Sequence, residues 1–231
     1  MPKLGMQPVR KRQLIEATIA TIAEHGFGEA TIARIARRAG LSSGIIAHYF
    51  GGKDALLAAT MRHLLTELLR DATARLRGAR TPLERAEAVI AANFGPEQFN
   101  REVIAAWFAF WGEVPHSPEL KRLNTVYMKR TRSNLAHALK PVAGAADADR
   151  IAGVAACLID GIWVRAALTE RAPDADAATA MIMTSIRDSL AEAGRAEAMR
   201  SAGLDACDNR ATDVGGADLT DSQVVAHAFL D

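Results

Sequence analysis

The sequence predicts an all-α protein. Apolar side chains recur at helical spacing through most of the 231 residues, and 49% of the chain is hydrophobic, which is enough to bury a sizeable core. Proline and glycine stand at the ends of these periodic stretches. The chain shows no convincing run of the alternating pattern that is typical of a strand. Helices therefore account for every element predicted below.

The first predicted helix begins at Pro8, a residue that is favoured in the first turn of a helix. Leu14, Ile19 and Ile22 form an apolar stripe along it. Gly26 is expected to end it, because glycine readily adopts the left-handed conformation found after helix ends.

Two short helices joined by a glycine turn are predicted over residues 31–50. Thr31 is a good N-cap for the first helix, and Gly40 ends it. Ala36 is small enough to let two steeply crossing helices approach, and Ser42 is expected to cap the second helix. This arrangement is typical of a helix-turn-helix, whose second helix enters the major groove of DNA. A purely structural helical hairpin is the alternative.

The second helix of this unit is expected to present two different faces. Its apolar positions should pack on the first helix, namely Ile45, Ile46 and Tyr49. Its remaining positions should be available to an outside partner, namely Ser43, Gly44, Ala47 and His48. Core packing is expected for Phe50 and is as good an interpretation as DNA contact for Tyr49.

Charge is unevenly distributed along the chain, although its net charge is only +1. The first 63 residues hold nine basic and four acidic side chains, whereas residues 201–231 hold one arginine and six aspartates. A basic N-terminal region favours binding to phosphate. Solvated helix faces are the alternative explanation for the arginines, but they explain the clustering less well.

The rest of the chain predicts a series of further helices. A long amphipathic helix is expected over 53–77, and Thr81-Pro82-Leu83-Glu84 forms a capping box that opens a helix over 82–94. Later helices are expected over 97–114, 118–139, 147–169 and 174–193, with Pro141 and Gly194 as two of the stops. Beyond residue 195 the composition predicts a mostly disordered acidic tail, with a short helix near 222–229.

The helix-turn-helix unit, together with His48-Tyr49-Phe50-Gly51-Gly52-Lys53-Asp54-Ala55-Leu56, resembles the DNA-binding domain of the tetracycline-repressor (TetR) family. Residues 1–8, 58–64, 107–111 and 158–163 resemble the choline-responsive repressors of glycine betaine synthesis within that family. The resemblance implies a DNA-binding head over 1–52 and a ligand-binding and dimerisation domain over 53–195. The tail over 196–231 departs from the family pattern. The resemblance also implies a homodimer that binds successive major grooves of a near-palindromic operator, represses genes of choline transport and glycine betaine synthesis, and is relieved by choline.

Residues for DNA contact follow from this resemblance and from the helix itself. Backbone amides at the start of the recognition helix favour a phosphate, and Ala47 is suited to touch a thymine methyl. Others match family positions that hold the sugar-phosphate backbone. The full expected set is Thr31, Ser42, Ser43, Gly44, Ile45, Ala47, His48, Tyr49 and Lys53. Because the helix carries no Arg, Asn or Gln, DNA shape and phosphate register should contribute heavily to specificity.

A ligand site is expected where the three tryptophans gather. Trp107 and Trp111 are four residues apart and share a helix face with Phe110 beside them, and Trp163 follows Asp160 by three. Aromatic surfaces and one carboxylate suit a quaternary ammonium ion such as choline. Asp160 lies in an apolar stretch and so needs a cation, either the ligand or an arginine such as Arg130 or Arg165. Core packing of the aromatic stripe and a site for another cationic or lipophilic compound remain open alternatives.

Other protein classes find little support in the sequence. A small helical enzyme would have to use one of four histidines, but these show neither metal-ligand spacing nor a nucleophile motif: His48, His63, His116 and His137. No cofactor is expected. Because the chain has no uncharged apolar run of about 18 residues and no signal peptide, a cytoplasmic protein is expected. The two cysteines have no CxxC spacing, and Cys157 is expected to be buried.

Overall fold

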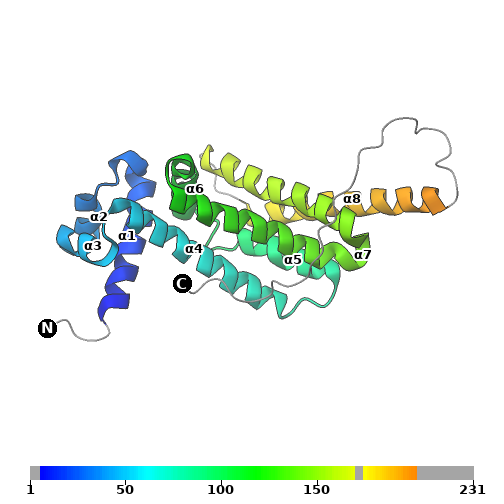
Figure 1. Ribbon diagram of the computed structural model, residues 1–231, viewed down its shortest axis with the longest axis horizontal. Coiled ribbons are helices and arrows are strands. Elements are labelled where there is room, and N and C mark those ends of the chain that lie inside the picture. Colours follow the sequence, from blue (N-terminus) through cyan, green and yellow to red (C-terminus); the bar gives the residue numbers. More distant parts are fainter. Residues whose placement is uncertain (1–5, 170–173, 202–231) are drawn as a thin grey trace. The chain divides into compact units, whose positions relative to one another are not determined.

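The structure is a computed structural model that describes residues 6–169 and 174–201. The described part is entirely helical apart from its turns, which confirms the predicted fold class (Figure 1). Its elements are α1 (Met6–Glu29), α2 (Ile32–Arg38), α3 (Ser43–Phe50), α4 (Lys53–Leu76), α5 (Pro82–Asn93), α6 (Arg101–Glu113), the 3₁₀ turn η1 (Val114–His116), α7 (Pro118–Ala167) and α8 (Ala175–Ser201). The helix predicted near 222–229 lies outside the described residues.

Two hydrophobic cores organise these helices. A small head core joins α1, α2, α3 and the start of α4, and its buried residues are Leu14, Ala17, Ile35, Ala36, Ile46 and Leu56. A much larger body core is formed by α1 together with α4, α5, α6, α7 and α8. Helix α1 belongs to both, with Leu14 in the head core and Ile22 in the body core, and it packs against α2, α4 and α6. It therefore connects the two cores directly.

The helix-turn-helix forms as predicted, with one local difference. Thr31 Oγ1 accepts a hydrogen bond from the Arg34 amide at 3.3 Å and so caps α2. Gly40 adopts a φ of +66°, a conformation that few other residues tolerate, and turns the chain toward α3. Ser42 occupies the N-cap position of α3, but its side chain makes no capping hydrogen bond. The predicted capping role of its hydroxyl was therefore wrong.

Side-chain caps fix the starts of α5 and α6. Thr81 and Glu84 form the predicted capping box, in which each side chain accepts from the backbone amide of the other. Asn100 Oδ1 accepts from the Val103 amide at 3.0 Å. Because Asn100 caps it, α6 begins at Arg101 rather than near residue 97.

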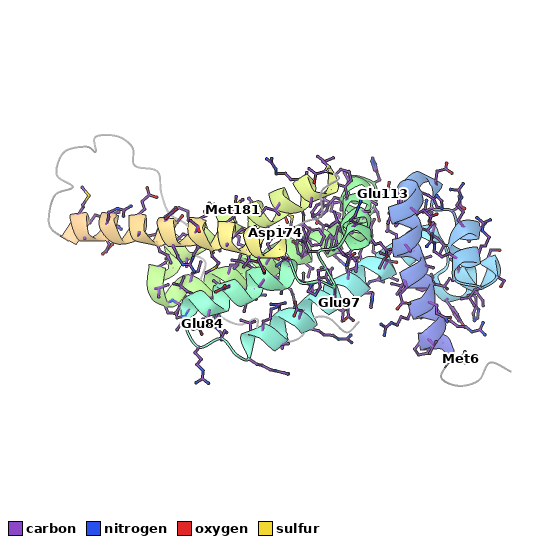
Figure 2. The ribbon with its side chains drawn as sticks, turned by 180° about the vertical axis from the view of Figure 1, so that it is seen from behind. Met6, Glu84, Glu97, Glu113, Asp174 and Met181 are labelled. Atoms are coloured by element: carbon purple, nitrogen blue, oxygen red, sulfur yellow. The ribbon has the colours of Figure 1, made fainter. Side chains whose placement is uncertain are left out.

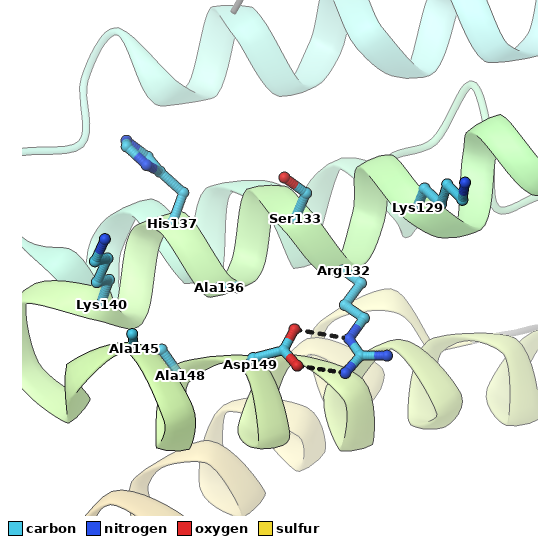
Figure 3. A pocket seen from close by; sticks show the side chains of 9 residues that line it. All are labelled: Lys129, Arg132, Ser133, Ala136, His137, Lys140, Ala145, Ala148 and Asp149. Atoms are coloured by element: carbon cyan, nitrogen blue, oxygen red, sulfur yellow. Dashed lines mark hydrogen bonds and ion pairs between the residues drawn. The ribbon is translucent and has the colours of Figure 1, made fainter. Parts of the chain in front are cut away.

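Helix α7 continues beyond the predicted stop at Pro141. Its break lies at Gly144, where φ is +72° and ψ is 175°, a region open essentially to glycine alone. The segments before and after Gly144 lie side by side, and Arg132 forms a paired hydrogen bond with Asp149 across them (Figure 3). Gly194 also fails to end its helix, since α8 runs to Ser201. Glycine inside a helix costs only about 1 kcal/mol, which the flanking helix-forming residues can offset.

Candidate DNA-binding surface and ligand site

The predicted DNA-binding residues gather on and around α3. Thr31, the N-cap of α2, is exposed to solvent. The N-cap of α3 and three residues of that helix are exposed as well, namely Ser42, Ser43, Ala47 and His48. Gly44 is exposed between them, and no heavy atom lies within 4 Å of the position that a Cβ would occupy there. Because the Ser42 side chain does not cap α3, the first amides of this helix have no side-chain acceptor from that residue. An external anion can therefore be accommodated there.

The apolar residues of α3 hold that exposed face on the head core. Ile46 is fully buried, whereas Ile45, Tyr49 and Phe50 are half-buried and pack against the same core. The Tyr49 ring lies 5.0 Å from the ring of His48, centroid to centroid. Packing therefore accounts for Phe50 as predicted, and Tyr49 combines packing with a position beside the exposed face.

Lys53 makes contacts within the protein. Its Nζ donates to the Phe27 carbonyl at 3.0 Å and lies 4.2 Å from the centroid of the Phe27 ring. A charged hydrogen bond and a cation–π contact thus join the first residue of α4 to the last turn of α1. In this structure Lys53 positions α4 relative to α1, a role that sequence reasoning missed.

Acidic side chains already pair with two of the basic residues of α2. Arg34 lies 3.1 Å from Glu29, and Arg38 pairs with Glu24. Glu24, Arg34 and Arg38 border a small cleft of about 290 Å³ between α1 and α2. Because such exposed pairs contribute only up to about 1 kcal/mol each, phosphates can compete for the arginines.

The predicted ligand residues do come together, in a buried aromatic cluster. Trp107 and Trp163 are 3% and 4% exposed, Phe110 is fully buried and Trp111 is half-buried. Ring centroids of Trp107 lie 5.8 Å from those of both Trp111 and Trp163, and Trp111 lies 6.5 Å from Trp163. The three indoles thus form one group across α6 and α7.

Further aromatic residues complete this cluster and were missed at the sequence level. Phe99 lies 5.4 Å from Trp163 and 4.9 Å from Phe94, and Tyr127 lies 5.1 Å from Trp107. They come from the loop between α5 and α6 and from the first half of α7. Their sequence positions carry no local pattern that points to the tryptophans, so the tertiary fold alone brings them in.

Asp160 joins the cluster through Tyr127. The Tyr127 hydroxyl lies 3.2 Å from Asp160 Oδ1, to which it donates, and 3.5 Å from Asn93 Oδ1. Asn93 Nδ2 donates to the Val89 carbonyl at 2.9 Å, which leaves its oxygen facing the tyrosine. Burial raises the pKa of the Asp160 carboxyl, and the hydrogen bond from Tyr127 partly offsets this by favouring the ionised form. Arg165, one of the two suggested partners, is exposed.

Buried polar atoms of this cluster, and of Gln98 next to Phe99 in the chain, lack partners among the described residues. The indole N–H groups of Trp107 and Trp163 and the side-chain oxygen of Gln98 are buried without a hydrogen bond. Buried polar groups are normally paired, so unpaired ones mark places where a ligand or a rearrangement can supply a partner.

A second, larger cleft of about 490 Å³ lies between the two halves of α7 (Figure 3). Its lining includes Lys129, Arg132, His137, Lys140 and Asp149. The Arg132 guanidinium is bound to Asp149 by hydrogen bonds of 2.9 and 2.5 Å. This basic cleft does not suit a cationic ligand, so the aromatic cluster remains the better candidate.

Two features were not found among the described residues. Residues 6–169 and 174–201 contain no group of three or more His, Cys, Asp or Glu side chains able to hold a metal ion. Within the same ranges, no helix has both the length and the apolar character needed to cross a membrane.

Comparison with known proteins identifies both regions. Residues 14–60 match the family model described as "Bacterial regulatory proteins, tetR family". Residues 82–191 match the family model described as "BetI-type transcriptional repressor, C-terminal". The HTH-type transcriptional regulator BetI of Brucella melitensis is 49% identical over 182 residues, which cover 79% of this chain and 92% of that protein.

Solved structures show the same fold. A putative transcriptional regulator from Pseudomonas aeruginosa PAO1 has a TM-score of 0.71 and 29% identity, covering 81% of this chain and 93% of that chain. A putative transcriptional regulator from Saccharomonospora viridis, crystallised in complex with choline, has a TM-score of 0.68 and 21% identity, covering 78% and 96%. The chain is therefore a transcriptional regulator rather than an enzyme, and it belongs to the TetR family, among its BetI-type repressors.

Proposed function

We propose that this protein represses genes of choline transport and glycine betaine synthesis, and that choline bound in the aromatic cluster relieves the repression. The observation that carries the proposal is the group of three indole rings, whose centroids lie within 6.5 Å of one another, linked through Tyr127 to Asp160. The 49% identity to a BetI regulator supports it, as does the choline complex of the structurally similar protein from Saccharomonospora viridis.

The cluster offers what a quaternary ammonium ion requires. Such an ion has no N–H to donate, so the faces of aromatic rings are its best partners, and a carboxylate supplies the opposite charge. Asp160 is held by the Tyr127 hydroxyl, which favours its ionised form. A carboxylate also disfavours glycine betaine, because the carboxylate of that zwitterion would be brought toward Asp160.

Burial of the aromatic rings couples ligand binding to a conformational change. Trp107, Phe110 and Trp163 are closed against one another, so a ligand has to separate them before it binds. Choline therefore favours a rearranged protein, and it relieves repression if that rearranged state binds operator more weakly.

For DNA binding, the amides of Ser43 and Gly44 hold a phosphate at the start of α3, and Ala47 and His48 face the groove. The predicted set around them, from Thr31 to Lys53, completes the contact with a near-palindromic operator. Lys53 contributes chiefly by positioning α4, because its ammonium is held at Phe27.

A homodimer matches the twofold symmetry of such an operator. The second half of α7 and the helix α8 carry exposed apolar side chains that suit a dimer interface. Val154 and Met181 are 45% and 59% exposed, Leu158 and Ile162 are half-buried, and Met181 is labelled on α8 in Figure 2. Cys157 is exposed on this stretch of α7, so its predicted burial within the chain was wrong. A twofold partner would cover these apolar side chains.

The test is calorimetric titration with choline, betaine aldehyde and glycine betaine, combined with release of a fluorescent operator duplex. Wild-type protein should bind choline in preference and release DNA. Trp111→Ala should weaken choline binding about 30-fold, because a desolvated cation–π contact is worth about 2 kcal/mol. Phe108→Ala is the matched control, since Phe108 is 43% exposed on the same helix and should leave binding unchanged. Preference for an unrelated cationic or lipophilic compound would overturn the choline assignment and keep the repressor.

A further inference from the structure

The loop between α5 and α6, residues 94–100, lies between the aromatic cluster and α4; Glu97 marks it in Figure 2. Phe94, Gln98 and Phe99 are all buried. The amides of Gln98 and Phe99 both donate to the Gly95 carbonyl, at 2.9 and 2.7 Å, which gives the loop a compact turn. Because close-packed interiors have low compressibility, a buried loop of this kind can transmit strain between the elements that it contacts.

One side of this loop belongs to the aromatic cluster. The Phe99 ring lies 5.4 Å from Trp163 and 4.9 Å from Phe94. A ligand that separates the indole rings must therefore also displace Phe99 or repack it.

The same loop is also fixed to α4. Gln98 Nε2 donates to the Leu64 carbonyl at 3.1 Å, in a buried hydrogen bond. Gly95 lies so close to α4 that a Cβ there would stand 2.8 Å from Asp71 Oδ2. Helix α4 begins at Lys53, which is bound to the end of α1, so a shift of α4 reaches the head.

Only the nitrogen of the Gln98 carboxamide makes a hydrogen bond within the described part of the chain. Its nitrogen holds α4, whereas its oxygen is buried and has no hydrogen-bond partner among the described residues. An unpaired buried acceptor is unfavourable, and it would be satisfied by a ligand that brings a hydroxyl donor. Choline carries one hydroxyl at the end opposite to its methyl groups.

We infer that Gln98 is a positioning residue that bridges the bound ligand and α4, an inference that rests on the proposed choline response. Its oxygen accepts the choline hydroxyl while its nitrogen stays on the Leu64 carbonyl. The quaternary ammonium group supplies binding at the indole rings, and the hydroxyl supplies the coupling to α4. Ligand binding and operator release are therefore carried by different parts of choline.

The experiment compares choline with ethyltrimethylammonium, which lacks the hydroxyl, on wild-type protein and on Gln98→Met. Methionine nearly conserves the volume and shape of glutamine but cannot make either hydrogen bond. Calorimetry gives ligand affinity, fluorescence anisotropy of an operator duplex gives release, and thermal melting checks the fold.

In wild-type protein both ligands should bind, and choline should lower operator affinity at least about fivefold more than ethyltrimethylammonium at saturation. In Gln98→Met both ligands should still bind, but the difference between them in operator release should disappear. Asn124→Leu is the matched control, because Asn124 also has an unpaired buried oxygen but donates to Met128 within α7. It should retain the wild-type difference.

Two results would overturn the inference while leaving the proposed function intact. The first is equal operator release by the two ligands in wild-type protein. The second is an unchanged advantage of choline in Gln98→Met. Absence of any choline binding to wild-type protein would instead overturn the proposed function, and the inference with it.

Discussion

The head and the body place their functional side chains in opposite ways. In the head, the residues offered to DNA are exposed on α3, and a small core of six buried residues holds them in position. In the body, the rings offered to the ligand are themselves part of the core, with Trp107 and Trp163 almost completely covered. Under the proposed function, the DNA surface therefore exists before its partner arrives, whereas the ligand site has to be opened.

This difference suits the proposed combination of DNA binding with a response to a small ligand. A preformed surface loses little conformational freedom on binding, which favours affinity. A closed site couples binding to rearrangement, because packed cores move between discrete arrangements rather than deforming continuously. Helix α1 and helix α4 belong to both cores and are the routes between them.

The strongest way to separate the two regions is to truncate one buried isoleucine in each. Ile46→Ala in α3 and Ile90→Ala in α5 remove the same atoms from fully buried positions, and each should lower the free energy of unfolding by about 2–4 kcal/mol. Ile46→Ala should also lower operator affinity more than about 100-fold, because the head core is so small. Ile90→Ala should leave operator affinity near wild type. Melting curves and anisotropy measure both, and an equal loss of operator affinity in the two variants would contradict the separation.

Titration of Asp160 provides a second test, confined to the body. Burial raises its pKa above the usual value for aspartate, so in the absence of ligand this group stabilises the fold at low pH and ceases to do so as pH rises through the raised pKa. Choline binding needs the ionised form and has the opposite dependence. Below that pKa, choline affinity should fall about tenfold for each pH unit.

Calorimetry over a pH series checks this dependence, and Asp160→Asn is the control. The amide should bind choline more weakly at neutral pH and show no such slope. Operator affinity without ligand should follow the same pH dependence in both proteins. A wild-type slope retained in Asp160→Asn would assign the titration to another group.

Substitution of Lys53 distinguishes a residue that positions α4 from one that contacts DNA directly. If it positions α4 through Phe27, then Lys53→Met should lower the free energy of unfolding by about 1–2 kcal/mol and leave the salt dependence of operator binding unchanged. A direct phosphate contact would instead reduce that slope by about one. Arg37→Met, at an exposed position of α2, is the comparison variant. Anisotropy at four or five salt concentrations distinguishes the two outcomes.

The smallest expected effect compares two N-caps. Thr81 caps α5 with a side-chain hydrogen bond, so Thr81→Ala should lower the free energy of unfolding by about 1 kcal/mol. Ser42 makes no such bond at α3, and Ser42→Ala should change stability little but weaken operator binding. Thermal melting and anisotropy on both variants check this. If Ser42→Ala destabilises the protein as much as Thr81→Ala does, the Ser42 side chain caps α3 after all and the contrast between the two N-caps is wrong.

The head was largely predictable because its signals are local. Thr31, Gly40 and the spacing of the apolar residues on α3 specify two helices and a turn within 20 residues. Predicting the aromatic site was harder. The i, i+4 spacing of Trp107 and Trp111 placed them on one face. Asn93, Phe99 and Tyr127, however, join the wider cluster through tertiary contacts that no local pattern encodes.

The predicted stops at Pro141 and Gly194 failed for a related reason. Residue preferences at helix ends are worth about 1–3 kcal/mol, and packing of the whole helix can outweigh them. At Gly144 the chain instead adopts a conformation that only glycine accepts readily, and this decides where α7 turns.

If the aromatic site and the DNA surface are coupled as proposed, each ligand must change the affinity for the other by the same factor, and this reciprocity can be measured. Choline affinity is measured by calorimetry with and without a saturating duplex that the protein has selected from random DNA, and duplex affinity is measured with and without saturating choline. We expect the duplex to weaken choline binding by the same factor as choline weakens duplex binding, about 5-fold to 150-fold. Identical choline affinity in the free and DNA-bound protein would contradict it.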